Sequence, residues 1–260
     1  EIIHVHHEYS YAPWNPDHTL LMIGLKTEEI VYNESLPMNL VFLIDVSGSM
    51  QDYNKLPLLK ESLAILVKNL RPVDRISIVV YAGSSRVVLE GSDSTDKEDI
   101  MDAINQLQAG GSTAGESGID LAYEVAERNF IEGGNNRIIL ATDGDFNVGT
   151  SSVEQLKEII SGKRATGIFL SVLGFGTGNT RDDIMESLAD HGNGIYYYID
   201  SIKEAEKVFV HQLGGSMVTV AKDVKLQIEF NPSRVKGYRL IGYENRVLNN
   251  NEFENDLKDA

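Results

Sequence analysis

Three short stretches of the chain carry oxygen-bearing side chains at spacings that suit a metal ion. The first is Asp45-Val46-Ser47-Gly48-Ser49-Met50, which directly follows the apolar run at 40–44. In an extended segment, residues two apart point the same way, so the Asp45 carboxylate and the Ser47 and Ser49 hydroxyls share one side. Hard oxygen ligands suit Mg²⁺, Mn²⁺ or Ca²⁺ rather than a soft metal. Taken alone, the pattern also fits a strand-to-helix turn with serine caps.

Two later loops strengthen the metal interpretation. Thr113 follows two glycines and precedes a predicted helix, although Thr113 and Glu116 also match a capping box at the start of that helix. Asp143 lies in a Thr-Asp-Gly segment after the apolar run at 138–141, where an ordinary Asp-Gly turn is the alternative. Both Asp45 and Asp143 are therefore expected at the carboxyl ends of central strands, where open α/β sheets bind ligands. We expect Asp45 to lie just beyond the buried part of its strand.

The elements that must position these loops alternate between buried strands and amphipathic helices. Strands are predicted at 40–44, 76–81, 138–141, 168–173 and 195–199. Helices are predicted at about 57–70, 97–108, 153–164, 181–190 and 202–213, with one more starting after 113. Strands that alternate with helices predict crossover connections, and hence a doubly wound, mostly parallel, Rossmann-like α/β sheet flanked by helices.

The two ends of the chain have a different pattern. A strand is predicted at 20–25, and the alternation of apolar and polar residues at 224–230 is typical of a half-buried antiparallel strand. A turn at 231–233 separates it from another predicted strand at 238–243. We therefore expect an N-terminal β segment (1–36), an α/β domain (37–213) and a C-terminal β segment (214–260), with the two end segments packed together as a small accessory β unit.

Composition limits the possible functions. The chain has 260 residues, 39 acidic and 23 basic side chains, and a net charge of −16. Such a surface repels phosphate groups, so nucleic acid is excluded as a partner and cations are favoured. The absence of cysteine excludes thiolate catalysis and cysteine-type zinc sites. No apolar run approaches the roughly 20 residues of a membrane-spanning helix, so direct membrane insertion is not expected.

The residues of the three loops, taken in order, resemble the metal-ion-dependent adhesion site of the von Willebrand factor type A domain. The match is one for one, and the resemblance covers about residues 38–213. It implies that Ser47, Ser49 and Thr113 bind the metal directly, and that Asp45 and Asp143 bind it directly or through water. It also implies an open coordination position for a carboxylate from a partner protein.

Further segments resemble the YfbK-like branch of bacterial cell-envelope proteins. They are residues 12–16, 133–137, 143–149 and 240–246. This resemblance implies an extracytoplasmic place in the cell envelope and a lipoprotein signal upstream. The chain opens with Glu1 rather than Met, so we expect a piece of a longer protein.

The expected function is a non-catalytic, divalent-cation-dependent module for adhesion or assembly, whose protein partner presents Asp or Glu. Two alternatives stay open. A metal-assisted hydrolase would need more carboxylates and usually histidine near the cation, and no histidine lies in the three loops. A structural envelope domain would hold its metal only for stability. His4 and His6 form a weaker metal candidate, with an ordinary exposed strand as the alternative.

Overall fold

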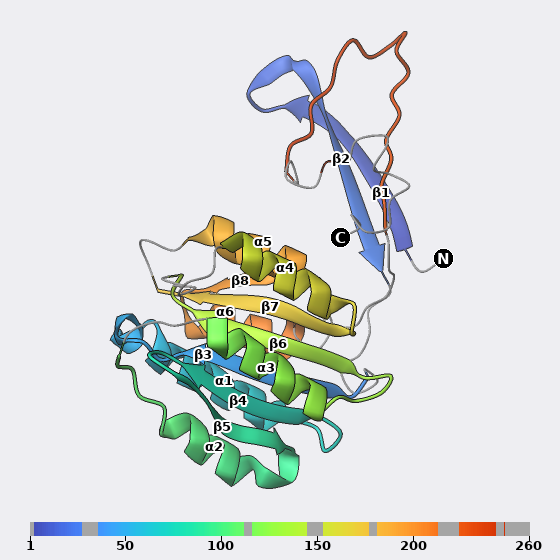
Figure 1. Ribbon diagram of the computed structural model, residues 1–260. Helices are drawn as coiled ribbons and strands as arrows, with labels where there is room; N and C mark the ends of the chain where they lie inside the picture. The colour runs from blue at the N-terminus through green and yellow to red at the C-terminus, as the bar shows by residue number, and fades with distance from the viewer. Residues whose placement is uncertain are drawn as a thin grey trace. The chain divides into compact units, whose positions relative to one another are not determined.

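The chain forms two compact units, each described here by itself. The computed structural model describes residues 3–27, 36–111, 116–144, 153–176, 181–212, 224–242 and 247. One unit comprises Val31–Val218, and the other combines the two ends of the chain, Glu1–Ile30 and Thr219–Ala260 (Figure 1). The boundary expected near Gly214-Gly215 lies outside the described residues.

The larger unit is built on one six-stranded sheet with the strand order β5-β4-β3-β6-β7-β8. Its strands are β3 (Met38–Asp45), β4 (Arg75–Tyr81), β5 (Ser85–Ser92), β6 (Asn135–Thr142), β7 (Ile168–Phe175) and β8 (Tyr196–Ile199). All neighbours pair in parallel except β5, which lies antiparallel to β4 at one edge. The prediction of a mostly parallel sheet is confirmed, and β5 is an addition that the sequence did not reveal.

Helices cover both faces of this sheet (Figure 1). On one face lie α1 (Leu56–Asn69), α2 (Lys97–Asn105), α6 (Ile202–Glu206) and η4 (Lys207–Gln212). On the other face lie α3 (Glu116–Arg128), α4 (Val153–Arg164) and α5 (Asp182–His191). Short 3₁₀ turns, η2 (Gly48–Gln51) and η3 (Ser94–Asp96), precede α1 and α2. This arrangement confirms the doubly wound prediction.

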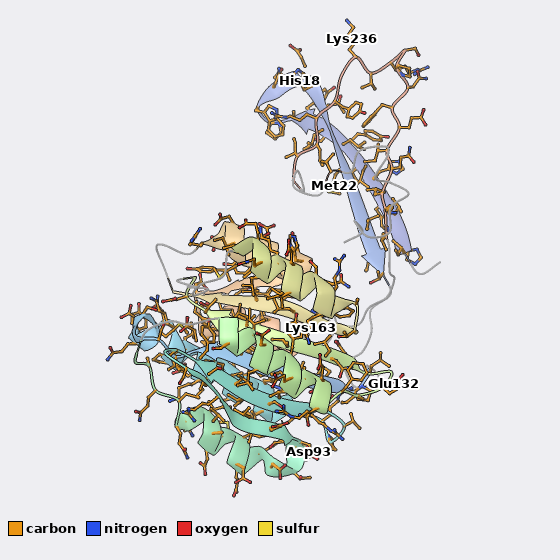
Figure 2. All side chains as sticks on the ribbon, in the orientation of Figure 1. His18, Met22, Asp93, Glu132, Lys163 and Lys236 are labelled. Carbon is orange, nitrogen blue, oxygen red and sulfur yellow. The ribbon has the colours of Figure 1, made fainter. Side chains whose placement is uncertain are left out.

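The central strand shows why the apolar runs lacked alternation. Leu40 and Phe42 on β3 pack into the core under α1, while Val41 and Leu43 pack into the core under α3. Because both faces of β3 are covered, every one of its residues is buried. Side chains from both faces of the sheet fill the space beneath the helices (Figure 2).

The smaller unit contains one antiparallel hairpin. It is formed by β1 (Ile3–Ala12) and β2 (Asn15–Thr27). The described residues 224–242 form neither helix nor strand, so the strands expected at 224–230 and 238–243 are wrong over that range. Alternation favours a strand only where a neighbouring strand and a covering layer exist, and Val224, Leu226 and Ile228 all remain exposed. The unit combines residues from both ends of the chain.

No described helix combines the length and the apolar character that a bilayer crossing requires.

Candidate metal centre

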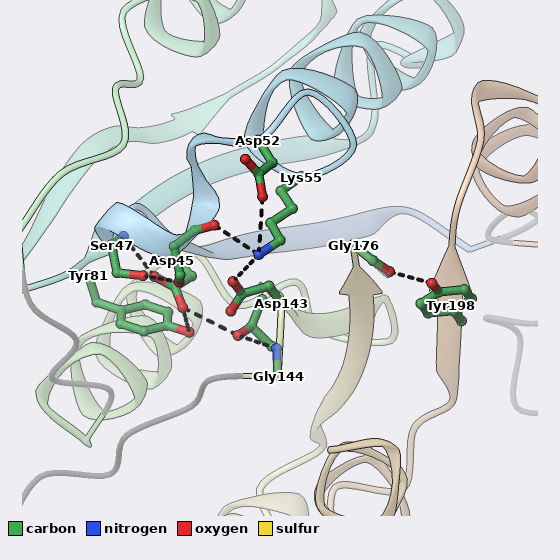
Figure 3. Close-up of polar contacts among 11 residues, drawn as sticks. Asp45, Ser47, Asp52, Lys55, Tyr81, Asp143, Gly144, Gly176 and Tyr198 are labelled. Carbon is green, nitrogen blue, oxygen red and sulfur yellow. Dashed lines mark hydrogen bonds and ion pairs between the residues drawn. The ribbon is translucent and has the colours of Figure 1, made fainter. Parts of the chain in front are cut away.

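Asp45 lies at the carboxyl edge of the sheet, held by three strands. It is the last residue of β3 and is fully buried, so its expected place beyond the buried part of the strand is wrong. The Ser47 backbone N–H donates to Asp45 Oδ1 at 2.8 Å, and the Tyr81 and Thr142 hydroxyls each donate to Oδ2 at 3.3 Å (Figure 3). Tyr81 ends β4 and Thr142 ends β6. The carboxylate therefore has one fixed orientation.

The surroundings of Asp45 favour a nearby cation. Burial raises the pKa of the Asp45 carboxyl above its usual value, because the ionised form loses hydration. Hydrogen bonds from Ser47 and Thr142 oppose this rise, and the Asp143 carboxylate adds to it by repulsion. Burial, followed by the Asp45 charge, also raises the pKa of Tyr81 well above its usual value, which keeps its hydroxyl protonated as a donor.

The two serines of the first loop face each other. Ser47 is buried and Ser49 is partly buried, and their hydroxyl oxygens lie 3.0 Å apart. Ser47 has extended backbone angles (φ −63°, ψ 166°), and η2 begins directly after it. The extended backbone from Asp45 to Ser47 is the local geometry that the spacing predicts.

The loop that contains two glycines lies against the first loop. The Gly110 N–H donates to the Val46 carbonyl at 2.7 Å, and the Gly48 N–H donates to the Gly111 carbonyl at 3.1 Å. Gly111 has φ +87°, a conformation that glycine adopts without strain. Thr113 itself lies outside the described residues, and its place at the metal stays a prediction.

Asp143 is the second carboxylate of the site, and it is paired with a lysine. Its side chain is 3% exposed, and Lys55 Nζ lies 2.9 Å from Asp143 Oδ2. The same ammonium donates to the Ser49 backbone carbonyl at 2.9 Å (Figure 3). Because one ammonium contacts both, Asp143 and the first loop lie within a few ångströms of each other. Sequence reasoning did not single out Lys55, since nothing in its local pattern links it to Asp143.

Gly118 on α3 packs closely against the strands that carry the candidate metal centre. A Cβ built on Gly118 would lie 2.9 Å from Tyr81 Cβ and 3.2 Å from Leu43 Cδ1. The missing side chain therefore lets α3 pack closely over the strands that carry Asp45 and its hydrogen-bond donor Tyr81.

The donor set fits a hard divalent cation. Two buried carboxylates and two hydroxyls meet at one edge of the sheet, and all four offer oxygen atoms as metal ligands. A positive group, the Lys55 ammonium, already lies against one carboxylate. Within the described part of the chain, no group of three His, Cys, Asp or Glu side chains gathers as a metal site. His4 and His6 are exposed on β1, across from Lys26 and Gly24 of β2.

Comparison with known proteins agrees with this geometry. Residues 39–211 match the model of the von Willebrand factor type A domain, and residues 215–260 match a model described as "Uncharacterized protein YfbK, C-terminal". "Uncharacterized protein YfbK" of Escherichia coli K12 is 47% identical over 254 residues, which cover 98% of this chain and 44% of that protein. The chain thus spans less than half the length of this relative.

Two solved structures show the same fold. A von Willebrand factor type A protein from Catenulispora acidiphila has a TM-score of 0.58 at 21% identity, over 76% of this chain and 45% of that one. Proximal thread matrix protein 1 from the mussel byssus, solved "with zinc occupied MIDAS motif", has a TM-score of 0.55 at 23% identity, over 69% of this chain and 46% of that one. At these identities the likeness concerns the fold alone. The match over residues 39–211 establishes that the chain belongs to the von Willebrand factor type A domain family.

Proposed function

We propose that this chain is a divalent-cation-dependent protein-binding module. Domains of this family are generally metal-dependent protein-interaction modules. The cation, Mg²⁺, Mn²⁺ or Ca²⁺, would be held by all five residues that the sequence singled out, namely Asp45, Ser47, Ser49, Thr113 and Asp143. The observation that carries the proposal is the meeting of Asp45, Ser47, Ser49 and Asp143 at one edge of the sheet.

The partner would present an Asp or Glu side chain. A bound cation supplies an electrophilic point of attachment for a carboxylate. The two buried carboxylates, Asp45 and Asp143, carry no more negative charge than a divalent ion neutralises, so an incoming carboxylate meets no net negative charge and can bind at the open position of the ion. Within the described residues, Asp52 is a further acid near the site, and its side chain is 73% exposed, which suits a solvated group rather than a ligand.

The contacts of the two carboxylates favour binding over catalysis. Asp45 accepts hydrogen bonds on both of its oxygens, and Asp143 is paired with Lys55. Carboxylates held in this way suit fixed ligands better than groups that must transfer a proton during a reaction. We therefore propose a non-enzymatic role.

We also propose a place in the extracytoplasmic cell envelope, with a lipid anchor on a segment outside this chain. This proposal is based on the resemblance to the YfbK-like branch.

Calorimetry and partner capture test the proposal together. We expect the wild-type protein to bind Mg²⁺, Mn²⁺ or Ca²⁺, and the Asp45→Asn variant to lose that binding. Immobilised wild-type protein should capture a partner protein from envelope extracts, and EDTA should release that partner. Amidation of the carboxyl groups of the extract proteins with a carbodiimide should prevent capture. Absence of cation binding at millimolar concentration would refute the metal centre. Cation binding without any cation-dependent capture would favour the structural alternative, and metal-dependent hydrolysis of a test ester would favour the hydrolase.

A further inference from the structure

The side chain of Lys55 packs against a glycine and ends at the candidate metal centre. Lys55 precedes α1, and its side chain is only 18% exposed. The stem passes over Gly176, just after β7, where a Cβ would lie 2.7 Å from Lys55 Cε. Gly176 has φ +92°, a conformation that side-chain-bearing residues rarely adopt. The backbone is therefore shaped around this lysine.

The ammonium of Lys55 contacts two residues of the candidate metal centre. It donates to Asp143 Oδ2 and to the Ser49 carbonyl, both at 2.9 Å. Asp52 Oδ2 lies further away, at 3.9 Å, and its exposed side chain is screened by water. An ammonium has three N–H donors, and two of those of Lys55 bind the Asp143 carboxylate and the Ser49 carbonyl. Lys55 is thus part of the centre rather than a surface charge near it.

We propose that Lys55 is a fixed counter-cation that weakens the affinity of the centre for a divalent ion and strengthens the affinity of the metal-loaded centre for a partner carboxylate. This inference rests on the function proposed above. It assigns opposite effects on two successive binding steps to a single side chain.

The charges of the buried groups give the two effects their signs. Asp45, Asp143 and Lys55 together leave the metal-free centre with one negative charge, where the carboxylates alone would leave two. An incoming divalent ion is therefore attracted less strongly than in a centre without the lysine. Once the ion is bound, the same ammonium leaves the centre with one positive charge instead of none. A carboxylate that binds next then restores neutrality.

The size of each effect follows from the closeness of the charges. At about 4 Å, a unit charge changes the affinity for another unit charge by about 6-fold in water and by about 1000-fold at an effective dielectric constant near 20, so for a partly solvated ion we expect a change on the order of 10- to 100-fold. We expect changes in this range, in opposite directions, for the two steps. A purely structural role for Lys55 would instead lower both affinities or leave both unchanged.

Lys55→Met is the decisive variant, because it keeps the stem that packs against Gly176 and removes only the charge. Lys60→Met is the matched control, since Lys60 lies on α1, the helix that Lys55 precedes, and donates to the Asn105 and Leu107 carbonyls away from the centre. Mn²⁺ binding is measured by calorimetry. Acetate is then titrated into the Mn²⁺-loaded protein, and water-proton relaxation follows displacement of water from the ion. If Lys55→Met misfolds, as judged by circular dichroism, Lys55→Gln replaces it.

We expect Lys55→Met to bind Mn²⁺ about 10- to 100-fold more tightly, and acetate more weakly by a similar factor, while Lys60→Met matches the wild type. Unchanged or weaker Mn²⁺ binding by Lys55→Met would overturn the inference, as would unchanged or tighter acetate binding. The Asp45→Asn variant distinguishes failure of the proposed metal centre from failure of the proposed role of Lys55. If Asp45→Asn binds Mn²⁺ like the wild type, the proposed metal centre fails. If it loses Mn²⁺ while Lys55→Met behaves like the wild type, only the role of Lys55 fails.

Discussion

Substitution of Asp45 by Asn and by Ala separates the ligand role of this residue from its structural role. Both variants remove the charge that attracts a cation, so both should lose divalent-cation affinity by on the order of 100-fold or more. They differ in what they leave behind in the buried pocket. Ala leaves the Ser47 N–H and the Tyr81 and Thr142 hydroxyls without their acceptor. Asn keeps an oxygen for Ser47, and its amide can donate to the hydroxyl oxygens.

The difference in stability can be estimated from these hydrogen bonds. The hydroxyls can rotate toward other acceptors, whereas the Ser47 N–H is fixed by its backbone. An orphaned buried donor costs about 1–3 kcal/mol, so Asp45→Ala should be less stable than Asp45→Asn by about that amount. For a domain of this size, that corresponds to a melting temperature lower by about 2–12 °C. Because burial raises the pKa of Asp45, its ionised form destabilises the metal-free fold at pH 7, and Asp45→Asn should be at least as stable as the wild type.

Thermal and urea unfolding in EDTA measure this difference, and calorimetry measures cation affinity. Equal melting temperatures for the Ala and Asn variants would show that the hydrogen bonds to Asp45 contribute little to stability. Cation affinity retained in both variants would show that Asp45 is not a ligand. Either result would refute the corresponding half of the reasoning.

The remaining predictions concern packing beneath the site and the surface beside it. Gly118→Ala should lower the free energy of unfolding by about 1–3 kcal/mol in urea titrations, because its Cβ would lie 2.9 Å from Tyr81 Cβ. Gly162→Ala on α4, where a Cβ meets nothing within 4 Å, is the matched control and should be neutral or stabilising. Tyr53 is 85% exposed in the turn before α1, and Tyr53→Ala should weaken capture of a metal-dependent partner at least about 5-fold in surface plasmon resonance without changing Mn²⁺ affinity. Unaltered capture by that variant would place the partner's contacts elsewhere.

The sheet was predictable because burial on both faces leaves a direct mark on the sequence. Each parallel strand reads as an apolar run, and the amphipathic helices between them require crossover connections. β5 left no such mark, since Ser85–Ser92 lies at the edge of the sheet with no residue fully buried. The helix expected at 202–213 was placed correctly, but the structure divides it into α6 and the π-helical η4, a change of hydrogen-bond register that periodicity does not encode.

The site was predictable where its residues share a local spacing or, like Asp143, directly follow a predicted central strand. The spacing of Asp45, Ser47 and Ser49 encodes their common side, because an extended backbone fixes it locally. The contact between Lys55 and Asp143 joins residues 88 positions apart and depends on where α1 begins relative to β6. The burial of Asp45 likewise depends on Tyr81 and Thr142, which reach it from the two neighbouring strands. Contacts of this kind arise from the assembled sheet rather than from any local pattern.

Two hydrogen bonds join the described parts of the first loop and the loop of Gly110 and Gly111, and both use only backbone atoms. Val46, Gly48, Gly110 and Gly111 contribute N–H and carbonyl groups to these bonds, so the two bonds themselves do not require any particular side chain. The rim of the candidate centre can therefore change in composition while the loops keep their relative position. A protein engineer could vary exposed positions such as Gln51, Asp52 and Tyr53 in a display library and select for new partners. The same independence would let natural selection diversify what the module recognises while leaving its cation-binding framework intact.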